Sequence, residues 1–384
     1  MVKKKSENAR RHLRAIGIFT VLGVILGLGM IRFVDWQLPE GISAGERTLR
    51  QLAIIGFMLI AFHLHIVIHE AGHLIFGLAS GYRFSSFRIG SFMLLKQDRK
   101  LVHKKHSVAG TGGQCLMIPP EMQDGKIPVI AYNLGGSIMN LIVSVVFLAL
   151  FMLTDKGGYA ALFHFMMIAT GLLSAFSNGI PIRTGTIDND GYNAISLGKN
   201  PEAMRAFWIQ MKVVEQLSLG LRLKDMPDDW FQLPSDASMK NNLVAAIGVF
   251  RCNRLMDQHR FGEALELIDH MLAIESGMVG IHRNMMICDR IYLELIGENK
   301  SELLEQLYNK EQKRFMKASR TSPSVIRTEY TLALLAEKDQ WKAHLALERF
   351  EKAAKRYPYP NDIQSERELM KIANEYAPKD MLPL

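Results

Sequence analysis

Cysteine is scarce in this chain of 384 residues, which contains only Cys115, Cys252 and Cys288. These three residues are far apart in the sequence and form no CxxC pair. Their scarcity argues against a disulfide framework and fits a reducing compartment for the water-soluble part of the chain.

The N-terminal apolar run, 15–31, is not followed by a cleavage site of the A-x-A type. A signal peptide has a basic start, a short apolar core and such a site, whereas this run is long for that core. We therefore interpret it as a retained membrane helix.

Acidic residues are fewer than basic ones, 38 against 46, so the net charge is +8. An excess of this sign can indicate nucleic-acid binding, but here the basic residues crowd the ends of apolar runs. That arrangement is typical of membrane topology, so no nucleic-acid partner is expected.

Long apolar runs are abundant in the first half of the chain. A helix needs about 20 mostly apolar residues to cross a bilayer. Four segments have this length, namely 15–34, 51–79, 127–153 and 159–182. Because basic residues precede the first span and crowd the loop 80–126, the positive-inside rule predicts a multi-pass cell-membrane protein. The N-terminus, this loop and the C-terminal half are then cytosolic.

The loop 80–126 has the composition of short strands. The segments YRFSSFRIGSFML and GTGGQCLMI combine aromatic, β-branched and glycine residues. They predict a β-hairpin against the membrane face, with an exposed edge near the spans; a solvated basic loop is the alternative.

Amphipathic helices dominate the sequence after Asp190. The segment 241–276 predicts two helices joined near 260–262, with packing residues at the spacing of a tetratricopeptide-like (TPR-like) second helix. The positions that carry this pattern are Ala264, Ile268, Met271, Ala346, Phe350, Ala353 and Pro358. A generic helical bundle is the alternative, and either form is expected to bind a partner or pack on the membrane core.

These patterns together predict an all-α polytopic membrane protein. It has about four transmembrane helices, a small membrane-associated β-hairpin region and a C-terminal α-helical, TPR-like soluble domain. The expected regions are 1–50 (tail, first helix and external loop), 51–192 (membrane core with the hairpin loop) and 193–384 (cytosolic helical domain).

One apolar span contains the sequence HLHIVIHEAGHLIFG, residues 63–77. Ionisable groups at membrane depth are costly and mark functional sites. His69 and His73 are four residues apart, so they share a helical face on which two imidazoles can bind one zinc ion. Glu70 lies beside the first of them, where it can act as a general base towards water.

Two other histidines share this span. His65 lies one turn before His69, but His65 and His73 are about 12 Å apart along the axis and cannot both reach one ion. His65 is therefore a packed or cavity-lining histidine, and His63 lies off this face.

A catalytic zinc site normally uses three protein ligands and one open position. The acidic residues just after the fourth span lie in NGIPIRTGTIDNDGYN, residues 178–193, at the cytosolic end, which is the end nearer the two histidines. Asp188 and Asp190 are therefore the candidates for the third ligand.

Three motifs in this order give the chain a resemblance to the site-2 protease family of intramembrane zinc metalloproteases, over roughly 51–193. They are the HEAGH motif on an outside-to-inside span, GGSIMN ending at Asn140, and Asn178-x-x-Pro181 followed by Asp190-Gly191. The expected hairpin resembles the membrane-associated strands of that family, which present the substrate in extended form.

The resemblance implies that His69, His73 and Asp190 bind zinc and that Glu70 is the base. It places Asn140 and Asn178 near the substrate or the oxyanion; interhelical hydrogen bonding is their alternative role. Two departures are Ser137, where the family has proline, and the long interval before Asp190, which keeps Asp188 as an alternative.

The sequence thus predicts an intramembrane zinc metalloprotease that cleaves transmembrane or membrane-associated protein segments near the cytosolic leaflet. Such activity serves regulated intramembrane proteolysis or the processing of signal peptides. The expected partners are a membrane protein substrate, the lipid bilayer and a protein bound to the helical domain. One alternative is a non-proteolytic membrane scaffold with a structural metal and a partner-binding helical domain. The other is a transporter or channel, which would need polar groups on several facing spans, and the first span offers none.

Overall fold

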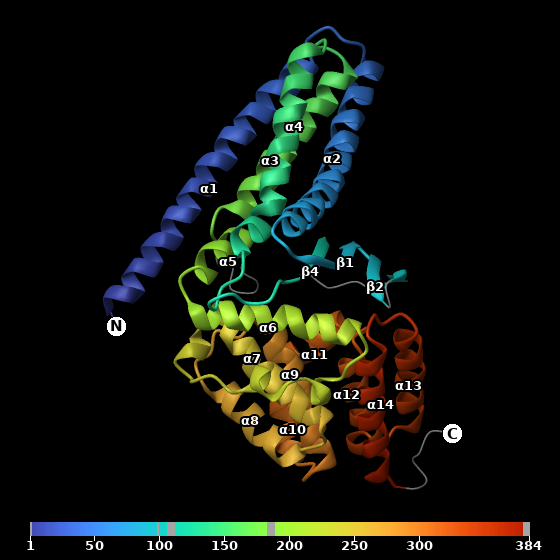
Figure 1. The fold of residues 1–384 in the computed structure, drawn as a ribbon. Coiled ribbons are helices and arrows are strands. Elements are labelled where there is room, and N and C mark those ends of the chain that lie inside the picture. The colour runs from blue at the N-terminus through green and yellow to red at the C-terminus, as the bar shows by residue number, and fades with distance from the viewer. Residues whose placement is uncertain (1, 98–99, 106–111, 183–188, 379–384) are drawn as a thin grey trace. The chain divides into compact units, whose positions relative to one another are not determined.

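The computed structural model describes residues 2–97, 100–105, 112–182 and 189–378. These residues are mostly helical and include one small antiparallel sheet (Figure 1). The elements up to residue 200 are α1 Val2–Gln37, α2 Ala44–Ala79, β1 Arg83–Ile89, β2 Phe92–Gln97, β3 Lys100–Lys105, β4 Gly113–Ile118, α3 Val129–Leu153, α4 Tyr159–Gly179 and α5 Asp190–Leu197.

The chain divides into two compact units. The first comprises Met1–Ile89, Gly112–Glu121 and Ile127–Asn200, and the second comprises Gly90–Thr111, Met122–Lys126 and Pro201–Leu384. The helices α2 to α4 belong to the first unit, and the helices from α6 onward belong to the second.

Three helices of the first unit, α2, α3 and α4, are long and apolar enough to cross a membrane. Their outward faces carry large apolar side chains, such as Leu52 at 62% and Val145 at 58% exposure. Such a surface is stable against lipid and not against water. Four spans were expected from the sequence. The first, 15–34, lies within α1 but is not among these three helices, so its crossing of a membrane remains a prediction.

Helix α2 has defined signals at both ends. Ser43 caps its N-terminus, because the Ser43 hydroxyl accepts a hydrogen bond from the Glu46 N–H at 3.2 Å. At the other end, Gly81 adopts a φ of +84°, a left-handed conformation that glycine takes without a steric penalty. The helix therefore ends before strand β1, and the chain turns from the apolar bundle into the sheet.

Close packing of α2 against α3 depends on a pair of glycines. A Cβ atom on Gly72 would lie 2.3 Å from the Gly135 carbonyl oxygen, so no larger residue fits there. Helix α4 packs against both. Phe33 of α1 stacks on Phe165 of α4, with ring centroids 3.9 Å apart.

The strands form one antiparallel sheet in the order β3-β2-β1-β4. The single hairpin expected from the sequence was too simple, because the lysine-rich segment Lys100–Lys105 also forms a strand. Phe87 of β1 pairs with Cys115 of β4, and Leu95 of β2 pairs with Val102 of β3. Strand β4 is at an edge of the sheet and packs against α2.

The second unit is built mainly from helices. They are α6 Pro201–Ser218, α7 Asn242–Asp257, α8 Phe261–Ala273, α9 Gly280–Ile296, α10 Ser301–Leu307, α11 Lys310–Ala318, α12 Pro323–Thr331, α13 Gln340–Ala354 and α14 Pro360–Glu375, with short helical turns between some of them. Helices α7 and α8 are the two expected in 241–276. Ala264, Ile268 and Met271 of α8 are fully buried, as their spacing predicts. A TPR-like arrangement remains a prediction.

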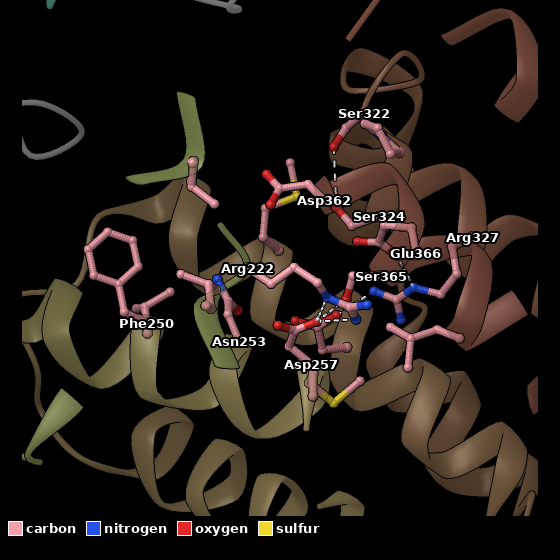
Figure 2. Close-up of a pocket in the computed structure, with 18 of the residues that line it drawn as sticks. Arg222, Phe250, Asn253, Asp257, Ser322, Ser324, Arg327, Asp362, Ser365 and Glu366 are labelled. Atoms are coloured by element: carbon pink, nitrogen blue, oxygen red, sulfur yellow. Dashed lines mark hydrogen bonds and ion pairs between the residues drawn. The ribbon is translucent and has the colours of Figure 1, made fainter. Parts of the chain in front are cut away.

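A cavity of about 320 Å³ lies inside the second unit (Figure 2). Its lining includes residues of α6, α7, α9, α12 and α14, together with Arg222. Ion pairs cross this cavity wall between segments far apart in the sequence, including Arg222 with Glu368 at 2.7 Å.

Candidate metal centre

Helix α2 presents His69 and His73 to the interior of the first unit. Because the two residues are one helical turn apart, their imidazoles lie on one face. Their Nε2 atoms are 3.1 Å apart, and the two side chains are only 12% and 10% exposed. Two nitrogen atoms that could bind a metal ion therefore point at one location in an apolar surrounding.

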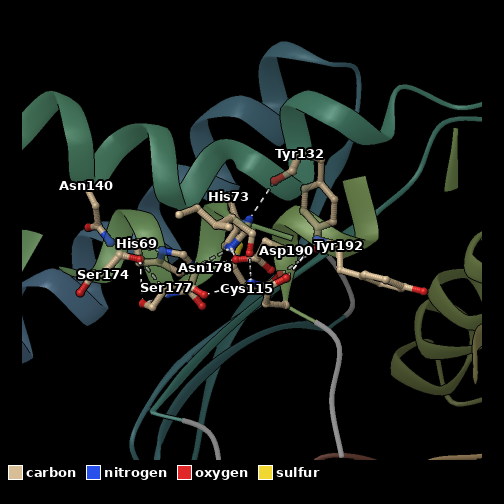
Figure 3. A network of polar contacts seen from close by, with 12 residues as sticks. His69, His73, Cys115, Tyr132, Asn140, Ser174, Ser177, Asn178, Asp190 and Tyr192 are labelled. Atoms are coloured by element: carbon tan, nitrogen blue, oxygen red, sulfur yellow. Dashed lines mark hydrogen bonds and ion pairs between the residues drawn. The ribbon is translucent and has the colours of Figure 1, made fainter. Parts of the chain in front are cut away.

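Asp190, the first residue of α5, completes this cluster (Figure 3). Its Oδ2 lies 3.0 Å from His69 Nε2 and 3.4 Å from His73 Nε2. Zinc bonds of 2.0–2.1 Å at tetrahedral angles separate neighbouring ligand atoms by about 3.3 Å. The three residues thus fit a zinc ion without rearrangement, and among the described residues they form the one group of this kind.

Asn189 fixes the position of Asp190. Its side chain is the N-cap of α5, accepting from the Tyr192 N–H at 3.0 Å. The same side chain donates to the carbonyl oxygens of Ser177 and Ile180 at the end of α4. Asn189 is not among the residues predicted from the sequence, although an asparagine directly before a helix is a recognisable capping signal.

The electrostatics of Asp190 suit a metal ligand. Burial acts to raise the pKa of this carboxyl group, but hydrogen bonds with His69 and His73 outweigh burial and hold the pKa below its usual range. The carboxylate is therefore ionised and available to a cation.

Backbone and side-chain contacts orient the two imidazoles. The Tyr132 carbonyl oxygen lies 2.8 Å from His73 Nδ1, and the Asn140 amide lies 3.3 Å from His69 Nδ1. Asn140 also contacts His65 Nδ1 at 3.1 Å. Partners of this kind on the second ring nitrogen fix the orientation and tautomer of metal-binding histidines.

His65 is fully buried and belongs to this chain of contacts. Its Nε2 lies 2.8 Å from the Met167 carbonyl oxygen, which can only accept a hydrogen bond. The His65 Nε2 therefore carries the proton. His63, in contrast, is exposed, and its Nδ1 lies 2.8 Å from the Leu59 carbonyl oxygen of its own helix.

Glu70 is 8% exposed and lies against strand β4. The Cys115 N–H donates a hydrogen bond to its carboxylate. A Cβ atom on Gly113 would lie 2.6 Å from Glu70 Cγ, so glycine is required for this close approach. Neither contact was predicted from the sequence. Any residue supplies a backbone N–H, and the approach of Gly113 to Glu70 depends on how the strand packs against the helix.

Asn178 and Asp188 were also predicted from the sequence as candidate site residues. Asn178 donates from Nδ2 to the Ser174 carbonyl oxygen at 3.0 Å, within its own helix. Asp188 lies outside the described residues. Gly136 of the GGSIMN segment lies against His69, and a Cβ atom there would approach the imidazole to 2.5 Å.

A membrane helix bundle with this cluster and a neighbouring glutamate has the layout of a membrane metalloprotease. The model of the family described as Peptidase family M50 matches residues 57–344. The chain belongs to this family, the site-2 protease family. No curated protein and no solved structure matches the chain.

Proposed function

We propose that this membrane metalloprotease is a zinc-dependent endopeptidase in which His69, His73 and Asp190 hold the metal and Glu70 is the general base. The convergence of three ligand atoms within 4.8 Å of one another, beside a buried carboxylate, carries the proposal. Two imidazoles and one carboxylate form a ligand set of catalytic zinc sites. When bound, zinc supplies the Lewis acidity that polarises the scissile carbonyl group.

Glu70 performs the proton transfers in this proposal. Its carboxylate takes a proton from the attacking water and then delivers it to the leaving amine. The hydrogen bond from the Cys115 N–H keeps the carboxylate between the histidines and strand β4, which is where a substrate held by the strand would lie.

Asn140 acts here as a positioning residue. For His69 to bind a cation through Nε2, its Nδ1 must carry a proton and needs an acceptor. Rotating the terminal amide of Asn140 by half a turn exchanges its oxygen and nitrogen. His69 Nδ1–H then donates to the Asn140 oxygen, the Asn140 N–H donates to His65 Nδ1, and His65 Nε2–H donates to the Met167 carbonyl oxygen. Asn178 is retained as a candidate for binding the oxyanion.

The substrate is proposed to be a transmembrane or membrane-anchored protein segment. A helix hides its amides in intrahelical hydrogen bonds, so the segment must unwind before water can attack. Edge strand β4 offers a place where an unwound segment can add as a further strand, close to Glu70.

The proposed orientation places the N-terminus, the loop 80–126 and the residues after 182 in the cytosol. Basic residues in these regions support it through the positive-inside rule. Cleavage then takes place near the cytosolic leaflet, and a TPR-like second unit is available to a cytosolic protein partner.

The test is metal content and proteolysis in Asp190→Asn and Asp188→Asn, made separately. The full-length proteins are reconstituted with single-span membrane substrates. We expect Asp190→Asn to lose both metal and cleavage, because it removes an anionic ligand, and Asp188→Asn to keep both. Loss only in Asp188→Asn would assign the third ligand to that residue. Stoichiometric metal without any cleavage by the unmutated protein would favour the scaffold alternative.

A further inference from the structure

The cavity of the second unit contains an excess of negative charge (Figure 2). Its lining includes two guanidinium groups, Arg222 and Arg327, and four carboxyl groups. The four carboxyl groups are Asp257, Asp289, Asp362 and Glu366. His282 also lines the cavity, but burial lowers its pKa, so it adds no positive charge near neutral pH.

Both guanidinium groups are already engaged by carboxylates. Arg222 binds Asp257 at 2.5 Å and Glu368 at 2.7 Å. Arg327 binds Asp289 at 2.5 Å and Glu366 at 2.9 Å. Neither arginine therefore has a charge to spare for the remaining carboxylate of the cavity.

Asp362 is that remaining carboxylate. It lies in the first turn of α14 and is half-buried, yet within the described part of the chain no hydrogen bond or ion pair to its carboxylate is found. Figure 2 draws no contact from it, in contrast to Arg222 and Arg327. Burial and the charges of Glu366 and Asp257 raise the pKa of Asp362 to about 7. An unpaired acid of this kind in a cavity marks a candidate binding site.

A second atom of the cavity wall also lacks a partner. Arg327 is 1% exposed, and its Nη1 has no hydrogen-bond acceptor among the described residues. Figure 2 shows its guanidinium directed towards Ser365, which also lines the cavity. A buried N–H without an acceptor costs about 1–3 kcal/mol. Because Nη1 itself is buried, a ligand oxygen recovers this cost only when a side-chain movement of the cavity wall exposes the atom.

We propose that this cavity binds one lysine or arginine residue of a partner polypeptide. The cationic end of that residue pairs with Asp362, and its backbone carbonyl oxygen accepts from Arg327 Nη1. Phe250, Met256 and Met286 line the same cavity and suit the aliphatic stem of the side chain. A cavity of about 320 Å³ takes a single long side chain and not a folded element.

Two alternatives fit the cavity less well. A metal ion would need three ligand atoms close together, and the described residues offer such a group only at His69, His73 and Asp190. A simple alkylamine satisfies Asp362 but brings no acceptor for Arg327. The proposal depends only on residues of the second unit and therefore stands apart from the proteolytic mechanism.

The test measures binding to the full-length protein in detergent, in a Glu70→Gln background so that proteolysis plays no part. The probes are a blocked tripeptide amide with central lysine, the same tripeptide with norleucine, and butylammonium, each titrated to 10 mM by calorimetry. We expect the lysine tripeptide to bind at least tenfold more tightly than either of the others. Equal binding of butylammonium would overturn the peptide assignment, and no saturable binding of the lysine tripeptide would overturn the site.

Variants locate the site. Asp362→Asn should weaken binding of the lysine tripeptide at least tenfold, because it removes the unpaired charge without removing an ion pair. Glu305→Gln removes an exposed carboxylate outside the cavity and should leave binding unchanged. Unweakened binding in a folded Asp362→Asn protein would contradict the proposal, and so would equal losses in both variants.

Discussion

The two polar clusters of this protein use their carboxylates differently. In the first unit, Asp190 has two imidazole nitrogens within 3.4 Å, and each imidazole is held by a further contact. In the second unit, Asp362 faces a cavity without a partner, whereas Arg222 and Arg327 each pair with two other carboxylates. In our proposals this difference corresponds to two kinds of positive ligand: a metal ion held by converging side chains, and a flexible cationic side chain held by one unpaired carboxylate.

Removing a histidine should break the first cluster most severely. We expect His69→Ala and His73→Ala to lose the bound metal and to reduce cleavage by at least about 10³-fold, because two ligands cannot hold the ion in place. Elemental analysis and a cleavage assay on the purified proteins measure both effects. His63→Ala is the matched control, since this exposed histidine of the same helix should change neither. Full metal content in both histidine variants would place the centre elsewhere.

Removing the Asn189 side chain, which holds Asp190 in place, should reduce metal binding less than removing a histidine. We expect Asn189→Ala to lower metal affinity by about 10–100-fold, because the cap that ties α5 to the end of α4 is lost. Asn193→Ala, in the same helix, serves as the control. Competition with a metal chelator gives the affinity. An Asn189→Ala protein with unchanged affinity would show that α5 is held by other contacts.

Substitutions of Asn140 should also change metal affinity, and here two variants with opposite expected results separate hydrogen bonding from packing. Asn140→Leu removes the acceptor for His69 Nδ1, so we expect metal affinity to fall by about 10-fold. Asn140→Asp restores an acceptor, so it should bind metal at least as tightly as the unmutated protein. Equal loss in both variants would contradict the hydrogen-bond role and indicate a packing role instead.

The charge of Asp362 should be visible as a small effect on stability. Because its pKa in the folded protein is raised to about 7, the folded state favours the neutral acid, and stability is lost as pH rises through 7. The charged groups around it are Glu366, Asp257, Asp289, Arg222 and Arg327. We expect Asp362→Asn to stabilise the second unit by on the order of 1–2 kcal/mol at pH 8 and by much less at pH 5.

Unfolding midpoints of the full-length proteins at both pH values measure this difference. Asp225→Asn, at an exposed site of the same unit, is the control and should show no such dependence on pH. A lower midpoint for Asp362→Asn at pH 8 would show that the carboxylate has a stabilising partner in solution.

The sequence predicted those features that depend on spacing along one element. The four-residue interval between His69 and His73 fixes their common face, and the scarcity of acids near the spans singled out Asp188 and Asp190. Three of the four expected spans are helices long and apolar enough to cross a membrane. The packing positions of α8 also followed from helical periodicity.

Features that depend on tertiary packing were not predictable in the same way. The Tyr132 carbonyl oxygen and the Cys115 N–H are backbone groups, so the residue types at these positions do not predict their contacts. Strand β3 is rich in lysine and lacks the aromatic and glycine residues from which the other strands were predicted, so its pairing with β2 was not expected. The charged cavity depends on pairs such as Arg222 with Glu368, which are separated by well over a hundred residues. Such pairs cannot be inferred from a single sequence.

In the proposed mechanism, Glu70 is a base that does not bind the metal. The decisive measurement is the metal content and turnover of purified Glu70→Gln protein with a membrane substrate. We predict one metal ion per chain, as in the unmutated protein, and a loss of turnover of about 10²–10⁴-fold. Turnover near that of the unmutated protein, or loss of the metal along with the activity, would contradict the account.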